Sequence, residues 1–140
     1  MERKTKELLI ILRPENIVET KVREGITELT VGEVDNITAA INEIYDLNDR
    51  PKASLVIAPP FYMKKEVLKT YSAKNGMRYI ALALVANSFA ARLVSSVMLG
   101  VRHRVAIIQN KKTAPSKVFA DKEKAVEWLV AELEKYNNKA

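Results

Sequence analysis

The sequence predicts an α/β domain with a single mixed β-sheet, in which an N-terminal antiparallel hairpin precedes a series of βα units. Two stretches rich in β-branched residues come first, and short apolar runs then alternate with segments of helical periodicity. This order is typical of a sheet whose later strands are parallel and joined by helices. The 140 residues are enough for one domain that buries its own core.

The hairpin is predicted from residues 17–22 and 26–31, which alternate apolar and polar side chains. Arg23-Glu24-Gly25 forms the predicted turn between them, because glycine adopts positive φ without steric cost. We therefore expect residues 1–16 to form an N-terminal arm, residues 17–136 the α/β domain, and residues 137–140 a frayed tail. The apolar run Leu8–Leu12 in the arm needs an apolar neighbour.

The βα units follow from changes in apolar spacing. Four apolar residues recur at helical intervals between Val34 and Ile44, which predicts a helix over residues 34–47 that ends before Pro51. The same reasoning predicts strands at 55–58, 79–85 and 117–119. It also predicts helices over about residues 63–74, 88–101 and 121–136. The helices can cover both faces of the sheet or gather on one face, and the sequence leaves both arrangements open.

The most informative motif is the segment 115–129, which predicts a strand, a turn and an amphipathic helix that begins at an Asp121 cap and carries the only tryptophan inward. Its pattern of Pro115, Phe119, Asp121, Ala125, Trp128 and Leu129 resembles the last strand and helix of the small bacterial STAS-like (SpoIIAA-like) domains, the fold of anti-sigma-factor antagonists. Residues 64–73 look like the second helix of that family, and residues 83–93 resemble its junction into the third helix. The resemblance covers residues 16–136. It implies a STAS-like fold without an assigned function, and core positions at Phe119, Trp128 and Leu129.

The chain departs from the family pattern around the second helix. Family members commonly have an Asp where this chain has residues 58–62, and the antagonists place a phosphorylatable Ser where this chain has Met63-Lys64-Lys65. We therefore expect no phosphorylation switch of that kind. Residues 100–108 look inserted, and their pattern fits either additional helical turns or a short strand.

Several classes of function are disfavoured by what the sequence lacks. It has no cysteine, which removes disulfides and thiolate chemistry and suits a reducing cytoplasm. It has no apolar stretch near the roughly 20 residues of a membrane-spanning helix. Its one histidine, His103, lies between Arg102 and Arg104, whose positive charges disfavour a general base at neutral pH. No catalytic motif, metal-ligand spacing or glycine-rich phosphate loop is present, so we expect a protein that is not an enzyme and has no metal or cofactor.

The net charge of +6 is unevenly distributed, since residues 50–117 contain 13 Lys and Arg but one Glu. Either this segment faces an anionic partner, or its charges scatter over the surface and pair with the acidic N-terminal third. The second interpretation is favoured. A basic cluster includes Arg102, Arg104, Lys111 and Lys112, but it lacks the interleaved aromatic residues on which nucleic-acid bases stack. Recognition of nucleic acid is therefore unsupported.

Asn87 and Ser88 precede the third predicted helix, where free backbone N–H groups favour an anion. Arg92, one turn further on, would then bind a phosphate or carboxylate. The alternative, which we favour, is that Ser88 only caps the helix and that Arg92 is a solvated or paired surface charge.

The third predicted helix is apolar on nearly all sides, although a helix on one sheet should have a polar outer face. Either it is wedged between neighbouring elements, or its apolar residues cover a partner subunit. The interface residues would be Phe89, Leu93, Val97 and Val101. We favour a STAS-like interaction module that forms a homo-oligomer and binds an unidentified protein partner. The main alternative is a binder of a small anionic or lipid-like ligand at Asn87, Ser88 and Arg92.

Overall fold

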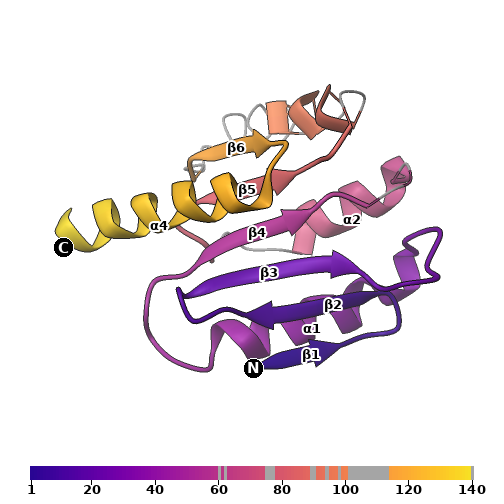
Figure 1. The fold of residues 1–140 in the computed structure, drawn as a ribbon. Coiled ribbons are helices and arrows are strands. Elements are labelled where there is room, and N and C mark those ends of the chain that lie inside the picture. Colours follow the sequence, from indigo (N-terminus) through magenta and orange to yellow (C-terminus); the bar gives the residue numbers. More distant parts are fainter. Residues whose placement is uncertain are drawn as a thin grey trace.

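The computed structural model describes residues 1–59, 61, 63–74, 78–88, 91–93, 95–97, 99–100 and 114–139. Within these residues, six strands form one sheet in the order in which they occur along the chain (Figure 1). They are β1 (Glu2–Lys4), β2 (Leu8–Leu12), β3 (Ile17–Val22), β4 (Ala53–Ile57), β5 (Leu82–Val85) and β6 (Ser116–Phe119).

The sheet is mixed, as the sequence predicts. β1 and β2 pair antiparallel, as do β2 and β3, whereas the pairs from β3 to β6 are parallel. A helical connection precedes each new parallel strand: α1 (Val34–Tyr45) before β4, α2 (Lys65–Lys74) before β5, and helical residues within 91–100 before β6. Right-handed crossovers that all step in one direction place their helices on one face of the sheet.

Helices cover both faces of the sheet, which settles the arrangement that the sequence left open. In Figure 1, α1 and α2 lie behind the sheet, and α4 (Lys122–Lys139) crosses in front of its β4–β6 half. Neighbouring residues on β3 therefore face different layers. Ile17 joins the core cluster under α4, which contains Leu55 and Leu129, while Val18 joins Ile10 in the cluster under α1. Each such fully buried aliphatic side chain contributes about 1.5–3 kcal/mol relative to an exposed one.

The antiparallel hairpin lies one element earlier than predicted. β3 covers the predicted residues 17–22, but its antiparallel partner is β2, from the segment expected to form an arm. Residues 26–31 are not a strand, because β2 and β4 already occupy both edges of β3. The turn at 23–25 does form, with Gly25 at φ +85°, and leads instead into a short 3-10 helix, η1 (Val31–Glu33).

The expected N-terminal arm is thus part of the sheet. The turn that joins β2 to β3 contains Pro14 and ends at Asn16, which has a φ of 67°. The Arg13 carbonyl accepts a hydrogen bond from the Asn16 N–H at 3.1 Å, and the Arg13 N–H donates to the Ile17 carbonyl at 2.9 Å. These hydrogen bonds and the left-handed Asn16 are typical of a three-residue hairpin loop. At the other end, α4 continues to Lys139, so residues 137–139 are helical and not a frayed tail.

The core positions predicted in the C-terminal motif are only partly enclosed. Leu129 is fully buried, whereas Phe119 and Trp128 are half-buried, with ring centroids 5.7 Å apart, and pack against the cluster under α4. The reason is that β6 pairs only with β5 among the described strands, so these two rings lie at an edge of the sheet. Asp121 caps α4 as expected, accepting a hydrogen bond from the Glu123 N–H at 2.9 Å.

Candidate functional site

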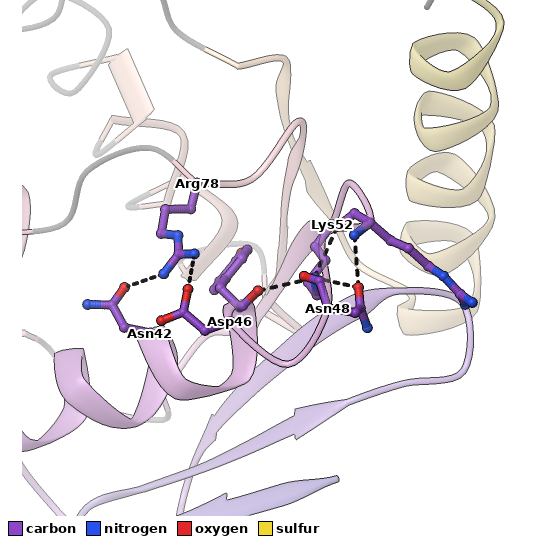
Figure 2. A network of polar contacts seen from close by, with 7 residues as sticks. Asn42, Asp46, Asn48, Lys52 and Arg78 are labelled. Atoms are coloured by element: carbon purple, nitrogen blue, oxygen red, sulfur yellow. Dashed lines mark hydrogen bonds and ion pairs between the residues drawn. The ribbon is translucent and has the colours of Figure 1, made fainter.

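A polar depression of about 370 Å³ lies at the amino ends of β4 and β5. Its walls come from the end of α1, the loop into β4, the residues before β5 and the last turn of α4. Figure 2 shows polar contacts of this region, made by side chains with other side chains and with backbone carbonyls. The lining residues are Tyr45, Asp46, Asn48, Asp49, Arg50, Pro51, Lys52, Arg78, Ile80 and Tyr136.

The loop from α1 into β4 is shaped by local hydrogen bonds. Helix α1 ends at Tyr45, and the Asp46 N–H still donates to the Asn42 carbonyl at 2.9 Å. Asn48 then accepts a hydrogen bond from the Arg50 N–H through its side-chain oxygen, also at 2.9 Å, which forms an Asx turn. Pro51 disfavours helical conformation at the residue before it. The chain therefore turns away from α1 and enters β4.

Lys52 turns its side chain back under this loop and is 2 % exposed. Its ammonium donates to the carbonyls of Tyr45 at 3.2 Å, Asn48 at 2.9 Å and Arg50 at 3.0 Å, and to the Asn48 side-chain oxygen at 3.0 Å. A cation here satisfies carbonyl groups at and beyond the end of α1 and offsets the negative end of the helix dipole. Burial lowers the pKa of Lys52, and the nearby positive charge of Arg78 acts in the same direction.

Arg78 fastens the segment before β5 to the end of α1. Its guanidinium donates to the Asn42 side-chain oxygen at 3.1 Å and forms a salt bridge with Asp46 (Figure 2). It also lies over the ring of Tyr45, with 5.3 Å from Cζ to the ring centroid, a cation–π arrangement. Burial raises the pKa of Tyr45 well above its usual value, so this phenol stays protonated at physiological pH.

The chemistry available here is binding by charge and hydrogen bonds. Groups of three or more His, Cys, Asp or Glu that would hold a metal ion do not occur in the described part of the chain. Asp49 and Arg50 line the depression, and neither forms a side-chain hydrogen bond or ion pair with another described residue. The depression thus presents one unpaired carboxylate and one unpaired guanidinium.

The residues predicted to bind an anion lie beyond the opposite, carboxyl end of β5. The Ser88 hydroxyl accepts a hydrogen bond from the Ala91 N–H at 3.0 Å, the capping role that we favoured. Arg92 donates to the carbonyls of Ala86 at 3.3 Å and Asn87 at 3.2 Å. These polar groups serve local structure, and ligand binding by them stays a prediction.

The predicted interface residues are described in part. Leu93 is 58 % exposed and Val97 is 61 % exposed, the two highest values among the large apolar side chains described. Phe89 and Val101 lie outside the described residues, as do Arg102, His103, Arg104, Lys111 and Lys112 of the basic cluster. Of residues 100–108, for which both helix and strand were predicted, only Gly100 is described, and it is helical; residues 101–108 lie outside the described residues.

Sequence reasoning missed Lys52 and Arg78 as site residues. Residues 48–51 were interpreted only as the end of a helix, and Lys52 looked like one more charge in a basic segment. One usable signal was its position directly before a buried strand, where a long side chain can fold back to meet the carbonyls of the preceding helix. Arg78 lacked a comparable signal, since its partners are 32 and 36 residues away.

The six-stranded mixed sheet and its helices define a SpoIIAA-like α/β fold, which confirms the predicted fold class. A solved structure with this likeness is an uncharacterized protein of the DUF3478 family, described as having a SpoIIAA-like fold, from Shewanella loihica PV-4. The TM-score is 0.56 and the identity 12 %, with 92 % of this chain and 90 % of that chain covered. This likeness shows the fold alone. No protein-family model matches the sequence, and no match was found among curated proteins. No helix of the described residues is long and apolar enough to cross a membrane.

Proposed function

We propose that this protein is a non-catalytic interaction module that acts as a homo-oligomer through the outer face of the helical residues 91–100. Leu93 and Val97 carry the proposal, because they are four residues apart and so lie on one side of the helix. Both are more than half exposed. Such a pair is positioned to cover apolar surface of another subunit.

The opposite side of this helix strengthens the argument. Ser95 is only 6 % exposed, while Leu93 and Val97 face outward. A helix that covers a sheet in a monomer normally buries its large apolar residues and exposes its polar ones. Here a small polar residue is inside and two aliphatic residues are outside, which favours a helix that is also covered on its outer side.

The charged groups of the described chain support a binding role over catalysis. The Lys52 ammonium and the Arg78 guanidinium are engaged by carbonyl, amide and carboxylate oxygens. The buried carboxylate of Glu19 is neutralised by two cations, Arg13 and Lys122. We place this module in the cytoplasm, which the absence of cysteine favours.

The test is the mass of the protein in solution, by size exclusion with light scattering. We expect the wild type to exceed the monomer mass of 15.8 kDa and the double variant L93E/V97E to be monomeric. Both side chains are exposed in the single chain, so the variant should keep its melting temperature within a few degrees, as is usual for surface changes.

The matched control is Leu47→Glu, another exposed aliphatic residue, 43 % exposed but on the loop after α1. This variant should keep the oligomer. A monomeric wild type at about 100 μM, a concentration that fills any interface of micromolar affinity, would contradict the proposal. So would an unchanged mass for L93E/V97E.

A further inference from the structure

We propose that the depression at the amino ends of β4 and β5 binds a small zwitterion: an α-amino acid or a compound with the same adjacent ammonium and carboxylate groups. The proposal rests on the charged groups that line this depression and is independent of the oligomer proposed above.

The charges that line the depression fall into engaged and free groups. Asp46 and Arg78 form a salt bridge, and the Lys52 ammonium is surrounded by four oxygens. Asp49 and Arg50 are exposed, and their side chains form no hydrogen bond or ion pair with another described residue, although their charges act on the nearby Lys52. One carboxylate and one guanidinium, adjacent in sequence, thus remain to face a ligand.

These two free charges disfavour a ligand of a single sign. A simple anion would approach Arg50 but would also meet the carboxylate of Asp49, and a simple cation would meet the guanidinium of Arg50. A ligand that carries both charges can pair its carboxylate with Arg50 and its ammonium with Asp49. Arg78 adds N–H donors for the ligand's carboxylate. Its guanidinium has five N–H groups, and hydrogen bonds to Asn42 and Asp46 use only two of its nitrogens.

The end of α4 also favours the ammonium. Tyr136 lies in the last turn of this helix, which ends at Lys139, and the negative end of a helix dipole stabilises a positive group. The end of α1 adds little, because the Lys52 ammonium already offsets its dipole.

The size and the remaining walls fit a molecule as large as an amino acid. The volume of about 370 Å³ is near the lower end of the roughly 300–1,000 Å³ of small-molecule sites. Tyr136, 49 % exposed, supplies an open aromatic face, and Pro51 and Ile80 add apolar surface. An aromatic side chain on the ligand would stack on Tyr136 in an offset or edge-on arrangement.

The test is a titration of the full chain with L-phenylalanine, in which binding is measured by ¹H–¹⁵N NMR. N-acetyl-L-phenylalanine lacks the ammonium, and L-phenylalanine amide lacks the carboxylate. We expect saturable shifts of the amides of residues 48–50, 52 and 78–80 with phenylalanine, at a dissociation constant on the order of millimolar for so small a ligand. Each derivative should bind about tenfold more weakly, because one charge pair is lost.

Two variants test the assignment of the charges. Arg50→Gln and Asp49→Asn should each weaken phenylalanine binding about fivefold or more while leaving the melting temperature unchanged, since both side chains are exposed. Arg50→Gln should reduce the preference for phenylalanine over its amide, and Asp49→Asn the preference over the N-acetyl derivative. Lys21→Gln, an exposed change on β3, should have no effect.

Three results would overturn the zwitterion site. One is the absence of saturable shifts up to about 20 mM, well above the expected dissociation constant. The others are equal binding of all three compounds, and equal binding of phenylalanine by the wild type and both variants. The mass of the protein measured by light scattering should not change when phenylalanine is added. A failure of the zwitterion proposal can therefore be distinguished from a failure of the oligomer proposal.

Discussion

The ammonium of Lys52 joins the end of α1 to the start of β4. It donates to three backbone carbonyls and one side-chain oxygen, all contributed by residues 45–50. A lysine can do this because its compact point charge accommodates several acceptors in different directions. Burial lowers the pKa of Lys52, because desolvation of the ammonium opposes the stabilisation that its hydrogen bonds provide.

We predict that Lys52→Met lowers the free energy of unfolding by about 2–4 kcal/mol, because the carbonyls at the end of α1 lose a charged donor. Lys52→Arg should not restore stability, since a planar guanidinium cannot replace an ammonium among four oxygens. The measurement is urea denaturation followed by circular dichroism.

Lys64→Met provides the control for this substitution. Lys64 is 68 % exposed and pairs with Glu28 at 3.4 Å, so its loss should cost less than about 1 kcal/mol. Equal losses in the two methionine variants would show that the contacts of Lys52 contribute no more than those of a surface lysine.

Residues such as Lys52 mark the limit of prediction from the sequence. Ser88 and Asp121 were predicted as helix caps because their hydrogen bonds reach only two or three residues along the chain. The Arg78 contacts with Asn42 and Asp46 depend on bringing α1 beside the segment before β5. The spacing of apolar residues along the sequence carries no information about such long-range contacts.

At the scale of elements, the prediction was correct for segments whose apolar residues pack against the sheet or the neighbouring strands as their spacing indicated. β3 has the predicted bounds, α1 starts at the predicted Val34, and β6 differs from the predicted strand by one residue. It failed for residues 26–31, which alternate like a strand, because both edges of their predicted partner β3 are occupied by β2 and β4. Thr30 instead donates through its hydroxyl to the buried carboxylate of Glu7 at 2.9 Å.

β2 was missed because its five residues are all apolar. Such a run lacks the alternation of a half-exposed strand and was too short to identify as a helix. The usable signal lay in the turn that follows β2, where Pro14 precedes Asn16, a residue type that tolerates positive φ. Asn16 has a φ of 67° in the structure. In the structure Ile10 is fully buried under α1, while Ile11 is half-buried and faces the other side of the strand.

We predict that Ile10→Ala lowers the free energy of unfolding by about 2–5 kcal/mol, the usual cost of a cavity in a packed core. Ile11→Ala removes the same atoms from the next residue and should cost about 1 kcal/mol, because its side chain is already partly solvated. Chemical denaturation of the two variants measures the difference. If both variants lost the same stability, the two faces of β2 would not differ as described.

At the scale of the whole molecule, Glu19 connects distant parts of the chain. It lies on β3, is 2 % exposed, and accepts hydrogen bonds from Arg13 at 2.9 Å and from Lys122 at 3.0 Å. Arg13 belongs to the β2–β3 turn and Lys122 begins α4, 103 residues after Glu19. This carboxylate therefore joins the β2–β3 hairpin to the helix that covers the other half of the sheet.

The charge of Glu19 makes stability depend on pH. Burial would raise its pKa, but the hydrogen bonds and positive charges of Lys122 and Arg13 outweigh burial, and the pKa lies below its usual value. A carboxylate with a lower pKa in the folded than in the unfolded chain stabilises the fold above the unfolded pKa of about 4.3. This stabilisation is lost as the pH falls through the lower, folded pKa.

We predict that Glu19→Gln lowers the free energy of unfolding by about 1–3 kcal/mol at pH 7, the value of hydrogen bonds to a charged group. The difference from the wild type should shrink as the pH falls below about 4.3, because the unfolded wild-type chain then takes up a proton that the folded chain resists. Urea denaturation at a series of pH values from about 7 to 3 covers this window.

Glu28→Gln is the matched control, because Glu28 forms an exposed ion pair with Lys64 and should contribute less than about 1 kcal/mol at any pH. The two variants separate a carboxylate that holds α4 against the hairpin from one that lies on the surface. If the difference between Glu19→Gln and the wild type stayed constant down to pH 3, the loss would come from altered packing, and the ion pairs would not be what couples the two halves of the sheet.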